Sequence, residues 1–533
     1  MHSHHRSIDP MGRCPRHRMS SGRHFVALLA LLSCVGSCYS EQKVLEPKVT
    51  EKVAEPELTH RTVSSIEELR RYAGESNQRV TLQPGTYWLD KNGKNPIFLD
   101  LSGTNSTFIL SGCHIKVDSR HLKGFGNGHE NRARLINLSG TNVTVERLTL
   151  STEIVDGQEG WADMYTNAVE IVGSGATLRN CKITTRGSRP YGSGDAFGKG
   201  GRPANGNQPG GVPFKLHSKH NGIRAGNGAG NVTLENIELR MFSFGHGIYF
   251  QEGAHDILVK NCQIIGDEMA NSDDVIADPL YQQYGKATYG EKIPPGIRIS
   301  RQEDGLRVYG KSGEFGAVKN VRIENTTVTR MRDAYAMGDM EGTLAIINSE
   351  SWGCEQGFTP PRVGGTITGC KGDAVNGPLL YFRRSGNKAT VEVELAGDQP
   401  AKGLWPIAII SGQNNKVMLT RSAPANFYSE HAFVFVAQSW REWRHRPDTN
   451  IDFSDNPGPS GGPVPTSACT IINKTGQTVV LGARATNNTV VSDAPVIDKG
   501  KENQITAPVW TQREIRILDT WGEYQVYPAL PTP

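Results

Sequence analysis

The sequence predicts an all-β protein: a right-handed, single-stranded parallel β-helix with a capping helix at its N-terminal end. Sixty glycines and only 7% aromatic residues among 533 are typical of many short strands joined by turns. One alternating phrase also recurs, as ATLRNCKIT (176–184), NVTLENIEL (231–239), DILVKNCQI (256–264) and NVRIENTTV (320–328). Because this alternation has a period of two, it excludes a helical repeat.

Each repeat carries an asparagine at the same place: Asn180, Asn236, Asn261 and Asn325. The middle pair is 25 residues apart and the outer steps are 56 and 64, as expected for stacked coils of which some carry inserted loops. No coil of this kind buries its apolar face alone. We therefore expect the asparagines to form a ladder of side-chain amides at one turn, with Cys181 and Cys262 inside as free thiols rather than disulfides.

The segments of the chain follow from the same pattern. A helix is expected at 64–74, where a Ser cap precedes Glu67 and Glu68 in the first turn, and it would cover the open end of the solenoid. The predicted organisation is an export signal at 1–38, a tether at 39–60, the β-helix with its capping helix and inserted loops at 61–430, and C-terminal β-rich coils with a tail at 431–533. Stretches 187–219, 267–294 and 441–466 interrupt the alternation of the strands. Long loops of this kind are either functional or disordered, and in a solenoid insertions on one face often build the binding groove.

The first 38 residues predict bacterial export. Five arginines precede the apolar run FVALLALL (25–32), which is too short to span a bilayer. Val35-Gly36-Ser37-Cys38 resembles a lipoprotein processing site, with simple cleavage nearby as the alternative. We expect a monomer in the cell envelope, periplasm or medium, touching a membrane only through that anchor. The leader accounts for the formal net charge of +4, so the remaining chain has no basic excess for nucleic acid.

A column of polar residues is predicted on the outside of the coils. Aligning NAVEI (167–171), NGIRA (221–225), HGIYF (246–250) and PGIRI (295–299) turns their apolar residues inward. The outward column is then Glu170, Arg224, Tyr249 and Arg298, with Asn137 extending it. Two arginines flanking a tyrosine suit a carboxylate or sulfate on a sugar. The alternative is a solvated face in which Glu170 merely pairs with Arg224.

Other candidates lie at the mouths of these strands. His246 stands there between Gly245 and Gly247, with Asn221 and Asn167 expected beside it, and His217 and His220 arriving from the preceding loop. The candidate catalytic residues are Tyr249, His246, Arg224, Arg298 and His220. The candidate substrate-binding residues are Glu170, Asn221, His217 and Gln251.

The stretch NGIRAGNGAGNVTLENIELRMFSFGHGIYFQEG (221–253) resembles the Gly-His-Gly region of the polygalacturonases, and GIRIS (296–300) is similar to their later Arg-Ile-Lys. Their paired aspartates are missing, because His220-Asn221-Gly222 stands at the aligned place. More broadly, the chain resembles the pectate-lyase-like superfamily of β-helix lyases and epimerases. That resemblance implies that Arg224 and Arg298 neutralise a uronate carboxylate, while Tyr249 and His246 act as base and acid in either order.

Two alternatives stay open. One is a glycoside hydrolase that uses Asp273, Asp274 or Glu252, since hydrolysis needs paired carboxylates. The other is a non-catalytic solenoid that binds a polysaccharide at the cell surface. The resemblance also allows calcium, for which Asp273 and Asp274 are weak candidate ligands, although no calcium loop of fixed spacing is present.

Overall fold

The computed structural model describes residues 57–509 together with 515–518 and 524–527. Within 57–509 the gaps are 91–92, 94, 123–124, 126–130, 156–164, 188–218, 280–297, 311–313, 376, 383–385, 398–405, 424–432 and 438–464. The export signal and nearly all of the predicted tether lie outside the described residues.

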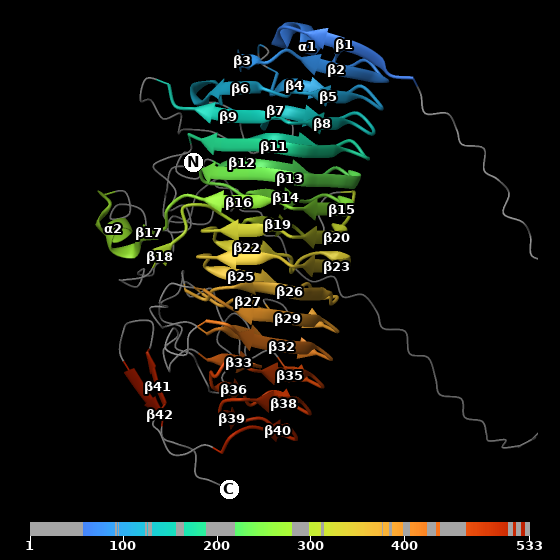
Figure 1. Cartoon of the computed structure of the whole chain (residues 1–533). Coiled ribbons are helices and arrows are strands. Elements are labelled where there is room, and N and C mark those ends of the chain that lie inside the picture. Colours follow the sequence, from blue (N-terminus) through green and yellow to red (C-terminus); the bar gives the residue numbers. More distant parts are fainter. Residues whose placement is uncertain are drawn as a thin grey trace, which may run out of the picture. The chain divides into compact units, whose positions relative to one another are not determined.

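The chain forms stacked coils whose strands line up in two long parallel sheets (Figure 1). The 21-stranded sheet, here sheet A, contains β1 (Thr59–Val63), β2 (Gln78–Leu82), β3 (Gly85–Trp88), β5 (Thr107–Ile109), β6 (Cys113–Asp118), β8 (Thr144–Glu146), β9 (Thr149–Glu153), β11 (Thr177–Arg186), β13 (Gly230–Phe242), β15 (His255–Lys260), β16 (Gln263–Gly266), β20 (Lys319–Glu324), β21 (Thr327–Thr329), β23 (Glu341–Ile347), β24 (Glu350–Trp352), β26 (Thr366–Gly372), β29 (Thr390–Leu395), β32 (Lys416–Arg421), β35 (Thr470–Asn473), β38 (Thr489–Ser492) and β40 (Gln504–Thr506).

The 13-stranded sheet, here sheet B, contains β4 (Ile97–Leu101), β7 (Ala133–Leu138), β10 (Tyr165–Ile171), β12 (Lys219–Ala225), β14 (Ile248–Phe250), β19 (Leu306–Val308), β22 (Asp333–Ala336), β25 (Gln356–Thr359), β27 (Leu380–Tyr381), β30 (Ala408–Ile410), β33 (Val434–Val436), β36 (Val479–Leu481) and β39 (Val496–Asp498). A four-stranded sheet of short strands adds β28 (Gly386–Asn387), β31 (Gly412–Gln413), β34 (Thr466–Ser467) and β37 (Ala485–Thr486). These parallel sheets confirm the predicted right-handed β-helix.

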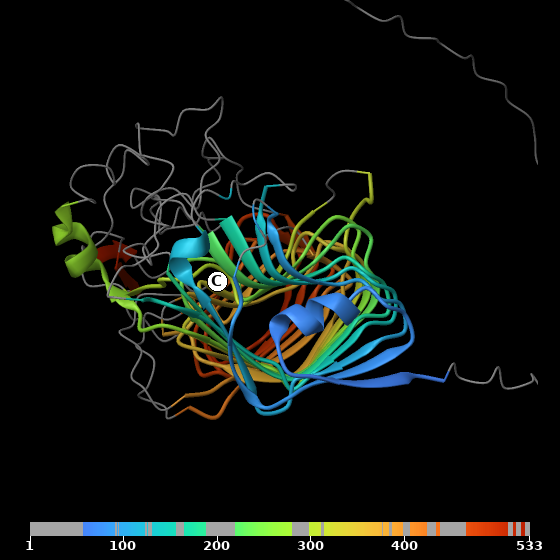
Figure 2. The same ribbon diagram turned by 90° about the horizontal axis from the view of Figure 1, so that it is seen from above.

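The predicted capping helix is present as α1 (Ile66–Tyr72), which lies across the end of the coils in Figure 2. Ser65 is its N-cap and accepts the backbone N–H of Glu68, which satisfies a donor that the first turn leaves without an intrahelical partner. Ile66 and Leu69 are buried in the main core. The helix therefore covers interior side chains that the first coil would otherwise expose to water.

The asparagine ladder is also confirmed. Asn180, Asn236, Asn261 and Asn325 all have positive φ, between 47° and 57°, a conformation that asparagine tolerates better than most residues. Asn236 Nδ2 donates to Asn180 Oδ1 at 2.9 Å, and Asn325 Nδ2 donates to Asn261 Oδ1 at 3.0 Å. Each of these two amide pairs thus holds one coil against the next.

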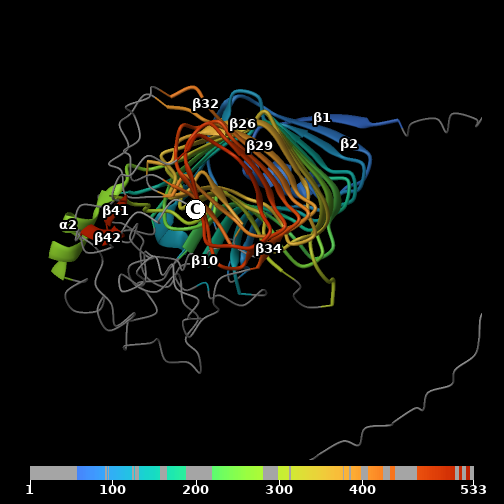
Figure 3. The ribbon, with the colours of Figure 1, turned by 90° about the horizontal axis from the view of Figure 1, so that it is seen from below.

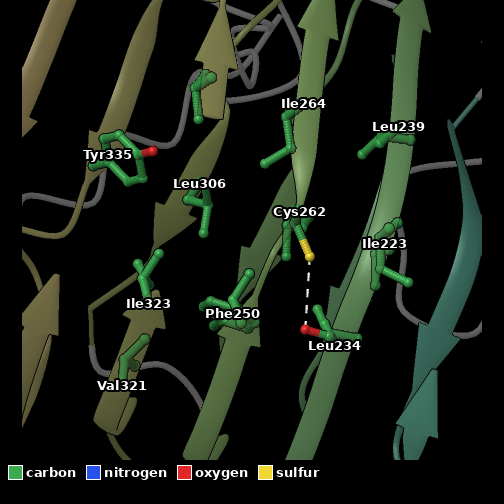
Figure 4. Close-up of a cluster of buried hydrophobic side chains, with 14 of the residues drawn as sticks. Ile223, Leu234, Leu239, Phe250, Cys262, Ile264, Leu306, Val321, Ile323 and Tyr335 are labelled. Carbon is green, nitrogen blue, oxygen red and sulfur yellow. Dashed lines mark hydrogen bonds between the residues drawn. The ribbon is translucent and has the colours of Figure 1, made fainter. Parts of the chain in front are cut away.

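The interior between the sheets is apolar. Figure 4 shows Ile223, Phe250 and Leu306 of sheet B among the inward side chains of sheet A. Cys181 and Cys262 are buried and free, as predicted, and so are the other four cysteines of the described part of the chain. The Cys262 thiol donates to the carbonyl oxygen of Leu234 at 3.6 Å. These thiols act as small core side chains.

Both sheets run on past residue 431 without a change of architecture. β30, β33, β36 and β39 are paired in parallel in sheet B, and β29, β32, β35, β38 and β40 are paired in sheet A (Figure 1). Figure 3 shows the red C-terminal coils stacked on the end of the solenoid. Outside the solenoid sheets, β17 (Ala270–Asn271) pairs with β18 (Arg298–Ile299), and β41 (Ile515–Leu518) pairs with β42 (Tyr524–Tyr527). No helix in the described part of the chain has the length and apolarity to span a membrane.

Candidate active site

Sheet B carries the predicted polar column on its outward face. Glu170 pairs in register with Asn137 and with Arg224, and Arg224 pairs with Tyr249. Their neighbours Ile223, Ile248 and Phe250 point into the core, so strand alternation sends the column outward. The prediction is confirmed for these four residues.

The assignment of Arg298 to this column is wrong. The strand that follows β14 is β19, and Tyr249 pairs with Arg307. Arg298 instead lies in β18, paired antiparallel with Asn271, and is exposed. The phrase PGIRI imitates a coil strand, but it belongs to an insertion. The true coil strand is Asp304-Gly305-Leu306-Arg307, which repeats the pattern of Asn221-Gly222-Ile223-Arg224.

A second polar column stands at the mouths of the same strands. Asn221 Nδ2 donates to Asn167 Oδ1 at 3.1 Å, and Asn221 Oδ1 accepts the backbone N–H of His246 at 3.0 Å. Nδ1 of His246 in turn accepts the backbone N–H of Asp304 at 3.3 Å. A Cβ at Gly247 would lie 2.7 Å from the carbonyl oxygen of Gly305, so only glycine allows the coils to approach this closely. The glycines of the Gly-His-Gly corner therefore permit the close packing of the coils, and the corner places the His246 imidazole at the mouth of its strand.

His246 is surrounded by other proton-carrying groups. Its Nε2 lies 2.6 Å from the Tyr309 hydroxyl and 3.1 Å from Oε2 of Glu303. The Tyr249 ring is 5.4 Å away between centroids. The side chain is only 2% exposed, and burial lowers its pKa to about 4, against the pull of Glu303 and Asp304. His246 is therefore neutral at neutral pH.

Two buried carboxylates lie behind the imidazole, and both are held by cations. Lys219 Nζ contacts Glu303 at 2.6 and 2.7 Å, and Arg332 Nε donates to Asp304 at 2.8 Å. Burial opposes their ionisation, but for Glu303 the neighbouring His246 imidazole and the cations Lys219 and Arg332 outweigh burial and lower its pKa. The pKa of Asp304 is lowered too, by Arg332 and Arg307 against burial. Both groups are ionised at neutral pH.

Arg224 is fully occupied within the protein. Its two terminal nitrogens contact Glu170 at 2.6 Å and Glu252 at 2.7 Å, and Nε donates to Gln251 Oε1 at 3.4 Å. Glu170 also faces Arg134 at 3.4 Å. Burial opposes ionisation of Glu170, yet Arg224 and Arg134 lower its pKa. Because arginines already neutralise Glu170, it does not fit a calcium site.

Arg132 differs from the other arginines of the site. It is 6% exposed, and Nη1 donates to the Tyr249 hydroxyl at 3.3 Å while the guanidinium lies 4.9 Å from the Tyr165 ring centre. No carboxylate of the described residues forms an ion pair with it, and its Nε has no hydrogen-bond partner. The Tyr249 hydroxyl donates onward to Asn167 Oδ1 at 2.9 Å. Glu170 and Glu252 act on its charge only from beyond ion-pair distance. A buried cation without a direct ion pair is costly, so this place favours an incoming anion.

The remaining predicted residues fall outside this group. His220 is buried and points toward Thr152, 3.3 Å from its Nε2, and burial lowers its pKa to about 3. His217 lies outside the described residues. Asp273 and Asp274 are exposed in the first turn of α2 (Ser272–Ala277). Metal-ligand clusters of three or more His, Cys, Asp or Glu side chains are absent from the described ranges.

Sequence reasoning missed several site residues: Arg132, Arg134, Glu303, Asp304, Arg307, Tyr309 and Arg332. For three of them a signal existed. Asp304-Gly305-Leu306-Arg307-Val308-Tyr309 has the same glycine and alternation as the two preceding coils. Arg132 and Arg332 precede strands whose outward residues give no such cue.

No family model matches the chain, and no curated protein matches it. Among solved structures, a family 6 polysaccharide lyase from Pseudopedobacter saltans is 13% identical over 84% of this chain and 92% of its own, with a TM-score of 0.41. The catalytic domain of a GH87 α-1,3-glucanase is 11% identical over 86% of this chain and 69% of its own, at 0.37. A pectate lyase from Bacillus sp. N165 is 9% identical over 76% and 93%, at 0.29. All three have right-handed β-helix folds.

Proposed function

We propose that this protein is a carbohydrate-active enzyme, a polysaccharide lyase or C5-epimerase, that removes the C5 proton of a uronic acid in an anionic glycan. The observation that carries the proposal is Arg132, a buried guanidinium without a carboxylate partner among the described residues, directly beside the Tyr249 hydroxyl. A uronate carboxylate placed there would accept hydrogen bonds from both groups. Charge-assisted bonds of this kind are the strong ones.

Neutralising the carboxylate is the step that both reactions share. The C5 proton becomes removable when negative charge can spread onto the carboxylate, and a cation already in place stabilises that charge as it develops. Burial raises the pKa of Tyr249, so its hydroxyl keeps its proton, and in this proposal that proton turns from Asn167 Oδ1 to the carboxylate when the glycan binds. The Tyr309 ring lies 5.5 Å from the His246 ring and 6.1 Å from the Tyr249 ring between centroids, so a phenol and an imidazole are close to the proposed carboxylate position for the proton transfer.

Hydrolysis is less well supported. A glycoside hydrolase needs one carboxyl group that is protonated and can donate to the leaving oxygen. Glu303, Asp304 and Glu170 are held ionised by neighbouring cations, and Asp273 and Asp274 stand on the exposed helix α2. A non-catalytic glycan-binding solenoid would not require proton-carrying groups next to the proposed anion-binding position at Arg132 and Tyr249.

Export belongs to the proposal as well. The leader and its Cys38 processing site would place the enzyme in the cell envelope or outside the cell, where polysaccharides are available. Fatty-acid labelling that disappears in Cys38→Ser would support a lipid anchor, whereas unlabelled protein of mature size would support simple cleavage.

The activity is tested by incubating the mature chain with polygalacturonate, alginate and glycosaminoglycans while following absorbance of the unsaturated uronate. We expect a rise with one of these glycans and its loss in Arg132→Ala. The matched control is Arg240→Ala, because Arg240 is an exposed arginine of sheet A that pairs only with Glu238 among the described residues. New reducing ends without unsaturation, or equal loss in both variants, would count against the proposal.

A further inference from the structure

We infer that Tyr309 is the residue that carries the proton, taking it from C5 and returning it to the O4 leaving group, and that His246 is a positioning residue locked in one tautomer by the backbone of Asp304. This inference rests on the proposed function. It assigns the proton transfer to a residue outside the Gly-His-Gly corner.

The tautomer follows from the hydrogen bonds of the ring. Nδ1 accepts the backbone N–H of Asp304 at 3.3 Å, while Oδ2 of Asp304 lies 3.5 Å from Nδ1 and forms no hydrogen bond with it. Nδ1 therefore carries no proton, and the neutral ring carries its proton on Nε2. That N–H faces the Tyr309 oxygen at 2.6 Å and Glu303 at 3.1 Å. His246 thus has no free basic nitrogen to offer a substrate.

The same contact prepares Tyr309 for the reaction. Its oxygen accepts from His246, which leaves the hydroxyl proton free to point elsewhere, and loss of that proton gives a phenolate that the Nε2–H stabilises. The guanidinium of Arg307 lies 5.0 Å from the Tyr309 ring centre. Tyr309 is also partly exposed, whereas Tyr249 and His246 are each 2% exposed. It is therefore the group of the three that a glycan can reach.

The step balances on this one residue. The phenolate oxygen takes the proton from C5, the C5–H electron pair forms the C4–C5 double bond, and the C4–O4 bond breaks. O4 leaves with the proton that Tyr309 has just gained, and the phenolate is regenerated. The overall step moves one proton from C5 to O4 and needs no other reactant.

The charged groups around Tyr309 decide how pH acts. Lys219, from β12, and Arg307, from β19, favour the phenolate, while Glu303 and the phenol of Tyr165 oppose it. Burial, the largest influence, raises the pKa of Tyr309 to about 12. Only a small fraction is ionised at neutral pH, so kcat/KM should rise about tenfold per pH unit across the neutral and mildly alkaline range.

The test compares the wild type with Tyr309→Phe, His246→Leu and His246→Gln in the elimination assay from pH 5 to 10, with glycan binding measured by affinity electrophoresis. We expect Tyr309→Phe to lose at least about 100-fold in kcat while still binding. His246→Leu should lower kcat without raising KM, and His246→Gln should recover part of the loss because its amide supplies an N–H donor. Tyr87→Phe is the matched control, since Tyr87 is a partly exposed tyrosine on β3 whose hydroxyl, among the described residues, donates only to the carbonyl oxygen of Gln83.

The outcomes separate the two claims. If the wild type gives no elimination or epimerisation, the proposed function fails. If the wild type is active but Tyr309→Phe keeps the wild-type rate, Tyr309 is not the proton carrier and the inference is overturned. The inference is also overturned if kcat/KM of the wild type falls at low pH and this fall is absent from His246→Gln. The wild-type pH profile keeps the test decisive even if a variant does not fold.

Discussion

The outward face of sheet B has two different halves. From β7 to β19 its column reads Asn137, Glu170, Arg224, Tyr249 and Arg307. From β27 to β39 the same column reads Tyr381, Ile409, Phe435, Val480 and Ile497. The first four of these apolar residues are at most 5% exposed and form a cluster of their own with Phe433, against which Ile497 packs.

This difference shows that the same coil backbone carries a charged outward face in one half and an apolar outward face in the other, so the fold alone does not determine the role of that face. Both halves are largely buried, so both depart from the rule that outward residues of a solenoid are solvated. In one half burial removes apolar area from water, which contributes stability. In the other half it concentrates charge and perturbs pKa values, which is typical of a functional site. Substitutions should therefore affect activity in one half and stability in the other.

The largest effect is expected from Arg132→Ala in the charged half. Loss of the guanidinium removes the stabilisation of charge on the substrate carboxylate, and kcat/KM should fall about a thousandfold. The free energy of unfolding should change little, because no carboxylate of the described residues loses a partner. Steady-state kinetics and urea unfolding together measure this. A large loss of stability with normal kinetics would contradict the expectation that the charged half serves activity and the apolar half serves stability.

Phe435→Ala tests the apolar half. The substitution leaves a cavity in the outward cluster and should lower the free energy of unfolding by about 3 to 4 kcal/mol, while activity well below the melting temperature stays at the wild-type level. Urea unfolding followed by circular dichroism is the measurement. Ile497→Ala, at the partly buried edge of the cluster, should cost less. Loss of activity in folded Phe435→Ala would show that the halves are coupled.

His220 should make the stability of the fold depend on pH. Burial lowers its pKa to about 3 in the folded chain from the ordinary value of 6.5, so between these values the unfolded chain binds a proton that the folded chain does not. Stability should fall by about 1.4 kcal/mol per pH unit as pH drops through that window, and should be unaffected above it. His220→Phe should remove this component. Equal pH dependence in both proteins, from unfolding at pH 4, 5 and 7, would refute the assignment.

The smallest effect is expected at the ladder, on neither half. Asn236→Ala removes the amide that bonds Asn180 and places alanine at a φ of 53°. We expect a loss of about 1 to 2 kcal/mol in the free energy of unfolding, and a smaller loss for Asn236→Gly, which tolerates that φ. Thermal unfolding of both variants measures the difference. If the ladder contributes nothing to stability, Asn236→Ala and Asn236→Gly will both unfold at the wild-type temperature.

The sequence was sufficient for the repeat and insufficient for the site. Asn236 and Ile223 are specified by local rules, namely turn geometry and alternation, so the fold and the start of the outward column could be predicted. The partners of His246 could not, because the insertion between β16 and β19 hides which coil comes next. The sequence PGIRI has the alternation of a coil strand and led to the wrong assignment of Arg298. The pairing of Tyr249 with Arg307 in the structure corrects that assignment.

The role of Arg132 was equally hidden. Its proposed role depends on the lack of an ion pair with any described carboxylate. Basic side chains pair here with carboxylates 84 or 54 residues away, as Lys219 does with Glu303 and Arg224 with Glu170, and such pairing is not visible in a strand pattern. Burial of the outward column could not be foreseen either, since alternation gives the direction of a side chain but not its exposure.

The central claim is that the charged half of sheet B removes a proton from C5 of a uronic acid. The most direct measurement is mass spectrometry of the products formed from uronate polysaccharides by the mature chain in deuterated water. The account predicts fragments with an unsaturated end, one water lighter than hydrolysis products, or intact chains with deuterium at C5. Saturated fragments of full hydrolysis mass, without deuterium at C5, would contradict it.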